Sequence, residues 1–261
     1  MSYATPAIVL RTRPYGDSDR IVSFLTEHHG KITGIAKGAK RSRHRFVNSL
    51  EPLSLVQLRF QDRPHGNLVF ILASDLLIGF QNLVSSLEKI AFASYLIEIT
   101  DALIGEREEN HLVFDHLKNG LNFLENHPSS FIFLTAFELK LLSLTGYQPA
   151  LDRCRGCGKA QNAVALLRWH FSPRNGSIFC QTCSRSQADI LPISAGALKT
   201  LADLQQQDSV FTLTSAPSWP AVKEMRFIIG RFIRFHVERE IKSVSFLDQF
   251  CASEQLLQRI S

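Results

Sequence analysis

Apolar residues in the first third of the chain occur in short runs separated by turn residues, a pattern that predicts β-strands. The turns include His28-His29-Gly30-Lys31 and Pro64-His65-Gly66, where glycine permits a tight reversal. The predicted strands are Ala7–Pro14, Arg20–Thr26, Ile32–Ala36, Leu50–Phe60 and Leu68–Ala73. Short strands in this number, without a helical period between them, predict a small barrel.

From Leu83 onward the apolar positions recur every three or four residues, which predicts helices. The predicted helices are Leu83–Gly105, Leu112–Asn126, Phe131–Leu144, Ala195–Gln206 and Pro220–Lys242. Ser129 or Ser130 can cap the third helix and Ser194 the fourth, because a serine hydroxyl accepts a hydrogen bond from a backbone N–H of the first turn.

The last predicted helix has an apolar side and a basic side. The apolar stripe consists of Met225, Ile228, Phe232 and Phe235. The basic cluster consists of Lys223, Arg226, Arg231 and Arg234. We interpret the basic cluster first as a solvated helix face.

Two Cys-x-x-Cys pairs lie between the third and fourth predicted helices, separated by 22 residues. They are Cys154 with Cys157, and Cys180 with Cys183. Each pair places two thiolates on one turn, and two such turns facing each other form a tetrahedral sulfur cage that suits Zn²⁺. Two disulfides or four unrelated thiols are the alternatives. Four thiolates leave no open coordination position, so we expect one structural Zn²⁺ per chain.

These patterns predict an α+β multidomain protein with three parts. Residues 1–80 are expected to form a basic, nucleic-acid-binding OB-fold β-barrel, although the strand pattern also leaves an SH3-like barrel open. Residues 81–147 and 191–250 are expected to form an α-helical domain. Residues 148–190 are expected to form the four-cysteine zinc module, inserted into the helical domain.

The positive charge of the chain is concentrated in the predicted barrel. Residues 1–80 carry 11 Lys and Arg against 6 Asp and Glu, whereas the remaining residues carry 18 of each. The whole net charge of +5 therefore lies in the first third of the chain. A basic module on a neutral body fits a polyanionic partner.

The densest positive charge lies in the segment Lys37–Arg45, between two predicted strands. Its cations are Lys37, Lys40, Arg41, Arg43 and Arg45, and it contains no carboxylate. Lys and Arg side chains on such a loop can follow phosphates and release condensed counterions. We therefore predict a DNA-binding site here, extended across the barrel by Arg11, Arg13 and Arg20, and without base specificity. The alternative is a loop that serves only solubility.

Signals for catalysis or for a membrane span are poor. The sequence contains no P-loop, dinucleotide-binding, His-Glu-x-x-His or Gly-x-Ser-x-Gly motif, so we expect no enzyme activity. No apolar run approaches the roughly 20 residues that a membrane span needs, and no leader pattern opens the chain. We therefore expect a cytoplasmic protein with no membrane partner.

Four segments together resemble the bacterial DNA repair and recombination mediator family RecO. They are AIVLRTRPYGDSDRIVSFLTEHHGKITGIAKGAKRSRHRF, LLSLTGYQPALDRCRGCG, SPRNGSIFCQTC and FIRFHVEREIKS. The strand–turn–strand block that runs into Ala-Lys-Gly-Ala-Lys-Arg, joined to Gly-Tyr-x-Pro-x-Leu before Cys-x-x-Cys-Gly, is the specific combination. The resemblance covers essentially the whole chain.

The resemblance implies an N-terminal OB-fold, a helical body and an inserted zinc module with all four cysteines. It also implies DNA repair and recombination without an enzymatic step. Family members bind single- and double-stranded DNA, anneal complementary strands coated with single-stranded-DNA-binding protein, and help load RecA together with RecR. The C-terminal tail of the single-stranded-DNA-binding protein is an expected partner, and association with the nucleoid is the expected location.

Two other functions fit the residues taken alone. An RNA-binding factor could use the same basic barrel and zinc module, because OB-folds also bind RNA. A zinc-stabilised interaction scaffold could use the basic loop to contact an acidic protein. Preference for DNA over a matched RNA strand, or binding to neither, separates these alternatives from a DNA mediator.

Overall fold

The computed structural model describes residues 2–161, 168–207, 217–237 and 239–257, with side chains up to residue 250. The strands are β1 (Ser2–Tyr15), β2 (Asp19–Thr26), β3 (Lys31–Ala36), β4 (Leu55–Gln61), β5 (Val69–Ile78), β6 (Trp169–Ser172), β7 (Ser177–Cys180) and β8 (Leu191–Ile193). The helices are the 3₁₀ helix η1 (Ala39–Arg41) and α1 (Gln81–Val84), α2 (Leu87–Leu103), α3 (His111–Asn126), α4 (Phe131–Leu144), α5 (Gln181–Ser184), α6 (Ala195–Gln206), α7 (Trp219–His236) and α8 (Ser243–Leu257).

The chain divides into two compact units. The first unit contains Met1–Pro128 and Ile241–Phe250, and the second contains Ser129–Glu240 and Cys251–Ser261. This division follows the packing of the chain, and the three predicted domain boundaries stay a prediction.

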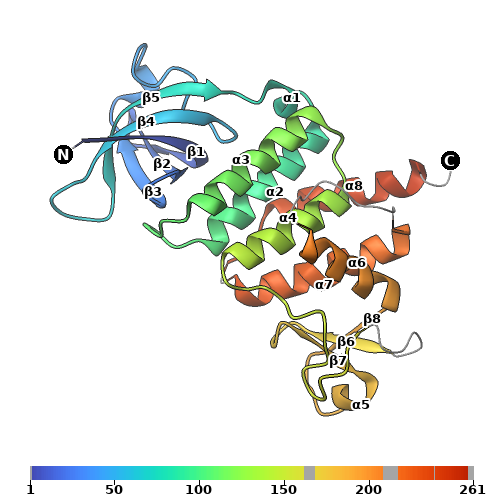
Figure 1. Ribbon diagram of the computed structural model, residues 1–261. Coiled ribbons are helices and arrows are strands. Elements are labelled where there is room, and N and C mark those ends of the chain that lie inside the picture. Colours follow the sequence, from blue (N-terminus) through green and yellow to red (C-terminus); the bar gives the residue numbers. More distant parts are fainter. Residues whose placement is uncertain (1, 162–167, 208–216, 238, 258–261) are drawn as a thin grey trace. The chain divides into compact units, whose positions relative to one another are not determined.

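The first five strands form a closed barrel in the order β1-β2-β3-β5-β4, with β1 also paired to β4 (Figure 1). All of the neighbouring pairs are antiparallel except β3 and β5, which run parallel. A five-stranded barrel of this order is the OB-fold, which confirms the prediction.

The interior of the barrel is filled by apolar side chains from every strand. The buried core residues are Ala7, Val9, Val22, Phe24, Ile32, Ala36, Phe46, Leu50, Val56, Leu58, Phe60, Val69 and Ile71. The parallel pairing of β3 with β5 depends on Gly34, because a Cβ there would lie 2.4 Å from Ile71 Cδ1. The missing side chain lets the two strands approach and close the barrel.

One predicted strand starts later than expected. The prediction began the fourth strand at Leu50, but β4 begins at Leu55. The residues before it make tertiary hydrogen bonds instead: Val9 N–H donates to Ser54 O, and Ser49 Oγ donates to Ser74 O. Individual hydrogen bonds to β1 and β5, in place of continuous strand pairing, therefore hold Ser49 and Ser54 against the barrel.

In the first unit, α2 and α3 pack side by side and contact the barrel (Figure 1). A buried carboxylate, Asp101 of α2, lies 3.0 Å from Arg11 Nε of β1. Lys31 of β3 is also buried, and its Nζ donates to the Asp101 carbonyl at 2.8 Å. Two basic residues of the barrel are thus fixed to one helix.

In the second unit, α4, α6 and α7 pack together, and β6, β7 and β8 form a small sheet in the order β7-β6-β8. Strands β6 and β7 form an antiparallel hairpin, and its connection, residues 173–176, ends with Gly176 at φ 55°. No helix in the described ranges has both the length and the apolar character to cross a membrane.

The structure corrects the pattern predicted for the last long helix. Phe235 was expected in the apolar stripe, but its side chain is 51% exposed. Arg226 was expected in the basic cluster, but it forms an ion pair with Glu138 of α4, which is fully buried. Phe235 lies at the edge of the buried stripe, and Arg226 lies on the other edge, which faces α4.

Candidate metal centre and candidate nucleic-acid interface

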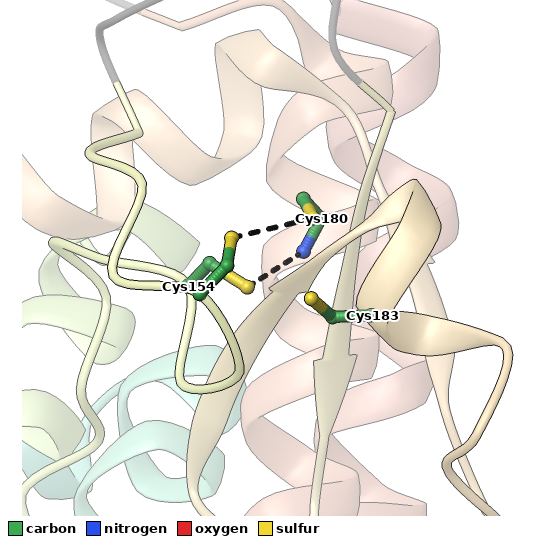
Figure 2. A group of neighbouring side chains, drawn as sticks. Cys154, Cys180 and Cys183 are labelled. Carbon is green, nitrogen blue, oxygen red and sulfur yellow. Dashed lines mark hydrogen bonds between the residues drawn. The ribbon is translucent and has the colours of Figure 1, made fainter.

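The four cysteines converge on one point. Cys154 and Cys157 lie on a turn before the small sheet, Cys180 ends β7, and Cys183 lies in α5. Their four sulfur atoms all lie within 4.8 Å of one another. Figure 2 shows Cys154, Cys180 and Cys183 pointing toward a common centre.

The sulfur geometry fits a tetrahedral metal ion. The Sγ atoms of Cys157 and Cys180 are 3.8 Å apart. Sulfur atoms at the corners of a tetrahedron, each about 2.3 Å from a zinc ion, would be separated by about 3.8 Å. All four cysteines are free thiols, so the two-disulfide alternative does not describe this structure.

The backbone holds the first cysteine pair against β7. Arg155 N–H donates to Ile178 O at 2.9 Å, and Gly158 N–H donates to Cys154 O at 2.8 Å. The turn also requires Gly156, because a Cβ there would lie 2.9 Å from both Cβ and Sγ of Cys183. The two pairs are therefore packed too tightly for a side chain between them.

The sulfur atoms differ in their affinity for protons. Burial acts to raise the pKa of Cys154, but backbone hydrogen bonds, first that of Cys180 N–H at 3.3 Å, outweigh it and lower the pKa to about 6. The side-chain hydrogen bond with Cys180, followed by burial, raises the pKa of Cys183 to about 12. A divalent cation at the centre would supply the charge needed to ionise every thiol. The cluster is therefore suited to a metal ion.

The predicted basic loop is held to the barrel by the turn between β1 and β2. Asp19 Oδ1 accepts hydrogen bonds from Gly38 N–H at 2.8 Å and from Ser18 Oγ at 3.0 Å. Lys40 N–H donates to Ser18 O at 2.9 Å. The Gly38 hydrogen bond, followed by that of Ser18, lowers the pKa of Asp19, so this carboxylate is charged at neutral pH. Asp19 thus fixes the start of the loop.

All five loop cations are exposed. Lys40 Nζ donates to Gly16 O, and Arg45 Nη2 donates to Lys37 O, each at 2.8 Å, so two of the cationic groups are positioned by backbone carbonyls. No ion pair of the described residues involves any cation of this loop. The Asp19 carboxylate acts electrostatically on Lys37 and Lys40 without forming an ion pair with either, so the loop keeps a net positive charge.

The three further arginines predicted for this interface are in different environments. Arg11 and Arg13 line one groove of the barrel, together with residues of β2 and β3. Arg11 is paired with Asp101, and Arg20 is half-buried and paired with Glu51. Arg13 forms no ion pair with the described residues, so it is the better placed of the three to meet a phosphate.

Sequence reasoning missed several residues of both sites. The close contact of Gly156 with Cys183 depends on the fold of a distant segment, so the local sequence does not indicate it. Asp101 and Glu51 are far in sequence from the arginines they pair with, so no local pattern indicates them. The Ser18-Asp19 pair is typical of a turn, but its contact with Gly38, 19 residues later, requires the folded barrel.

Comparison with known proteins gives one consistent result. The family model described as Recombination protein O N terminal matches residues 1–80, and the model described as Recombination protein O C terminal matches residues 84–245. The chain is 34% identical over 250 residues to DNA repair protein RecO of Syntrophus aciditrophicus (strain SB), covering 95% of this chain and 96% of that protein. It is 32% identical over 242 residues to DNA repair protein RecO of Anaeromyxobacter dehalogenans (strain 2CP-C), covering 93% of this chain and 94% of that protein. Two domain models and full-length relatives therefore agree that this chain belongs to the RecO family of DNA repair and recombination proteins.

Proposed function

We propose that the chain is a non-enzymatic recombination mediator that binds single- and double-stranded DNA through the basic loop of its barrel. It anneals complementary strands coated with single-stranded-DNA-binding protein and acts with RecR to load RecA. The observation that carries this proposal is the loop Lys37–Arg45, whose five cations are exposed and form no ion pair with the described residues, fixed to an OB-fold barrel. Membership of a DNA repair family also supports a role in DNA repair and recombination.

The physical basis of annealing is charge. Two DNA strands repel each other, and a coating protein on each strand adds a further barrier. Cations that bind the backbone phosphates release counterions and leave the base edges free to pair. A contact with the tail of the coating protein would raise the local concentration of the mediator on that strand. None of these steps requires a covalent intermediate or nucleotide hydrolysis.

We also propose that the metal is Zn²⁺ and that its role is structural. The supporting observations are four sulfur ligands, a tetrahedral separation between two of them and a tightly packed surrounding turn. Zn²⁺ prefers this ligand set, and four sulfur ligands leave no position for a reactive water. The zinc module would then stabilise its unit rather than carry out chemistry.

The test is single-stranded DNA binding as a function of salt concentration, with a variant that lacks the loop charge. The loop variant changes Lys37, Lys40, Arg41, Arg43 and Arg45 to Ala. A matched control changes five exposed cations of the second unit to Ala: Arg153, Lys159, Arg168, Arg185 and Lys199. Arg11 and Arg20 stay unchanged, because their ion pairs would couple their loss to stability.

If every loop cation meets a phosphate, the log–log salt dependence of the loop variant should flatten by about 3.5, at roughly 0.7 per contact on single strands. The control should keep the wild-type slope. Equal losses of DNA affinity in the loop variant and the control would show that binding follows net charge alone. If the wild-type protein binds no oligonucleotide at low salt, the DNA-binding role is wrong. Stronger binding to a matched RNA strand would favour the RNA-binding alternative.

A further inference from the structure

The exposed side of α7 combines cations with aromatic side chains. We call the residues Lys223, Phe227, Arg231, Arg234 and Phe235 the α7 face, and all five are exposed. Successive steps of four, four and three residues bring the first four to one side of the helix, and Phe235 lies at the shoulder of that side. From Lys223 to Phe235 the face extends about 18 Å along the helix axis, at about 1.5 Å per residue.

Carboxylates next to the α7 face are already engaged elsewhere. Glu224 accepts hydrogen bonds from the backbone N–H of Ser194, at 2.8 Å, and from the Ser194 hydroxyl. Glu138 forms an ion pair with Arg226, which is not part of the α7 face. Neither Arg231 nor Arg234 forms an ion pair with a described residue. The positive charges of Arg231 and Arg234 are therefore available to an anionic partner.

The aromatic side chains of the α7 face are unusually open for phenylalanine. Phe227 is 58% exposed and Phe235 is 51% exposed, although six other α7 residues are buried in the unit. Exposed aromatic rings have a cost in water, so two of them among cations on one helix indicate a contact surface. Arg174, from the connection between β6 and β7, lies over the Phe235 ring with its Cζ 5.9 Å from the ring centroid, and adds a further cation at this end.

The helix surface beside the α7 face is open. At Gly230, one turn along the helix from Phe227, a Cβ would meet no heavy atom within 4 Å, so no neighbouring segment closes over the helix at this point. An apolar peptide side chain gains most from a pocket that encloses it, whereas a nucleic-acid base gains by lying on an exposed aromatic ring. Exposed aromatic rings flanked by cations are the features of a single-strand binding surface.

We propose that the α7 face is a second nucleic-acid-binding surface, specific for single strands. Lys223, Arg231 and Arg234 bind backbone phosphates, and Phe227 and Phe235 stack on bases. This inference rests on the proposed function and deepens it. With one surface on the barrel and another on the second unit, one chain holds two strands, and annealing needs both of them.

The experiment uses the full-length chain and fluorescently labelled oligothymidylate. The charge variant of the α7 face changes Lys223, Arg231 and Arg234 to Ala, and its matched control changes Lys159, Arg185 and Lys199 to Ala. The stacking variant is Phe227→Ala, and Phe227→Trp is its rescue, because stacking requires only an aromatic face. Each protein is also tested in annealing of two complementary oligonucleotides, and circular dichroism checks that each is folded.

In the charge variant, the slope of log affinity against log salt concentration should flatten by about 2, at roughly 0.7 per phosphate contact. Phe227→Ala should weaken binding about 5-fold or more, the effect of losing about 1 kcal/mol or more of base stacking. Phe227→Trp should bind as wild type, and the charge variant should anneal more slowly than its control. A photocrosslink from 5-iododeoxyuridine to the peptide that contains Phe227 would locate the strand directly.

Other results separate this inference from the proposed function. If the barrel-loop variant loses binding while the α7 variants match their controls, the second surface does not exist and the mediator role stands. A different result would be that the α7 variants keep DNA binding and annealing but no longer bind an acidic peptide with one apolar side chain. The α7 face would then bind a protein partner, and the inference would be wrong. If the wild-type protein binds no oligonucleotide, both the proposed function and this inference are wrong.

Discussion

At the scale of single residues, the metal centre depends on the absence of one side chain. Gly156 lies between two ligands of one pair, and the sulfur of Cys183 occupies the space that its Cβ would take. The Cys-x-x-Cys spacing could be read from the sequence, because both ligands of each pair are local. The close approach of Gly156 to Cys183 could not, since it requires the two pairs to be folded together.

Gly156→Ala is expected to weaken metal binding, because Cys183 must move to accommodate the new methyl group. Loss of positioning around a metal ligand typically weakens affinity about 10-fold or more. Competition with a chromogenic zinc chelator measures the affinity. Gly196→Ala is the control: it lies outside the cysteine turns and meets no neighbour within 4 Å, so it should keep the wild-type affinity. Equal affinity of the Gly156 and Gly196 variants would contradict the packing argument.

The ion pair of Arg226 with Glu138 shows a second residue-scale effect. Glu138 is fully buried, so removing Arg226 takes the counter-charge away from a carboxylate that water does not reach. Arg226→Ala should lower the free energy of unfolding by about 3–5 kcal/mol, measured by urea denaturation. The double change Glu138→Leu with Arg226→Leu should recover most of this loss. Additive losses in the double variant would argue against a buried pair.

At the scale of elements, two helices with their own serine caps start where the sequence predicts, whereas a helix capped from elsewhere was not predicted. A serine cap alone was not sufficient: the helix predicted from Leu83 is divided into α1 and α2, and α2 starts at Leu87 after its cap Ser86. Ser130 and Ser194 accept hydrogen bonds from Phe133 N–H and Ala197 N–H, so α4 and α6 begin where the sequence predicts. By contrast, α8 was not predicted as a separate helix. Its first backbone N–H groups donate to the carboxylate of Glu98, which lies on α2. Such a cap is a tertiary contact, so the local sequence carries no sign of it.

Glu98→Ala should therefore destabilise the start of α8. The change removes acceptors for the N–H groups of Lys242 and Ser243, at 3.0 and 2.8 Å. Loss of a helix cap costs about 1 kcal/mol, and amide hydrogen exchange in the first turn of α8 should accelerate accordingly. Glu109→Ala, which removes an exposed carboxylate outside any helix, is the control. Unchanged exchange in α8 would show that the carboxylate does not act as a cap.

At the scale of the whole molecule, the barrel topology and the cysteine cluster were predicted because their signals are periodic or local. The arrangement of cations was predicted only in part. The sequence located the charge of the loop, but the pairing of Arg11 with Asp101 and of Arg226 with Glu138 depends on the folded units. Charge counted along a sequence therefore overestimates the charge that a partner can meet.

Removal of the metal should destabilise the second unit, because metal binding contributes to folding. Cys154→Ser is expected to lose bound zinc, measured by elemental analysis, and to lower the melting temperature. Acidification should release the metal from wild type, since protons compete for the thiolates, and the release should be reversed at neutral pH. An unchanged melting temperature with a full complement of zinc in the variant would overturn the structural role.

The anchored loop Lys37–Arg45 also has a consequence for proteolysis. Trypsin cleaves after Lys and Arg, and this exposed segment offers it five adjacent targets between two strands of a closed barrel. A cut there should leave the barrel associated, because Phe46 and Leu50 on the far side of the loop are buried in its core. Limited digestion should therefore produce a nicked but folded chain. A bound strand would shield the same bonds, so the rate of nicking reports occupancy of the loop without any label on the DNA.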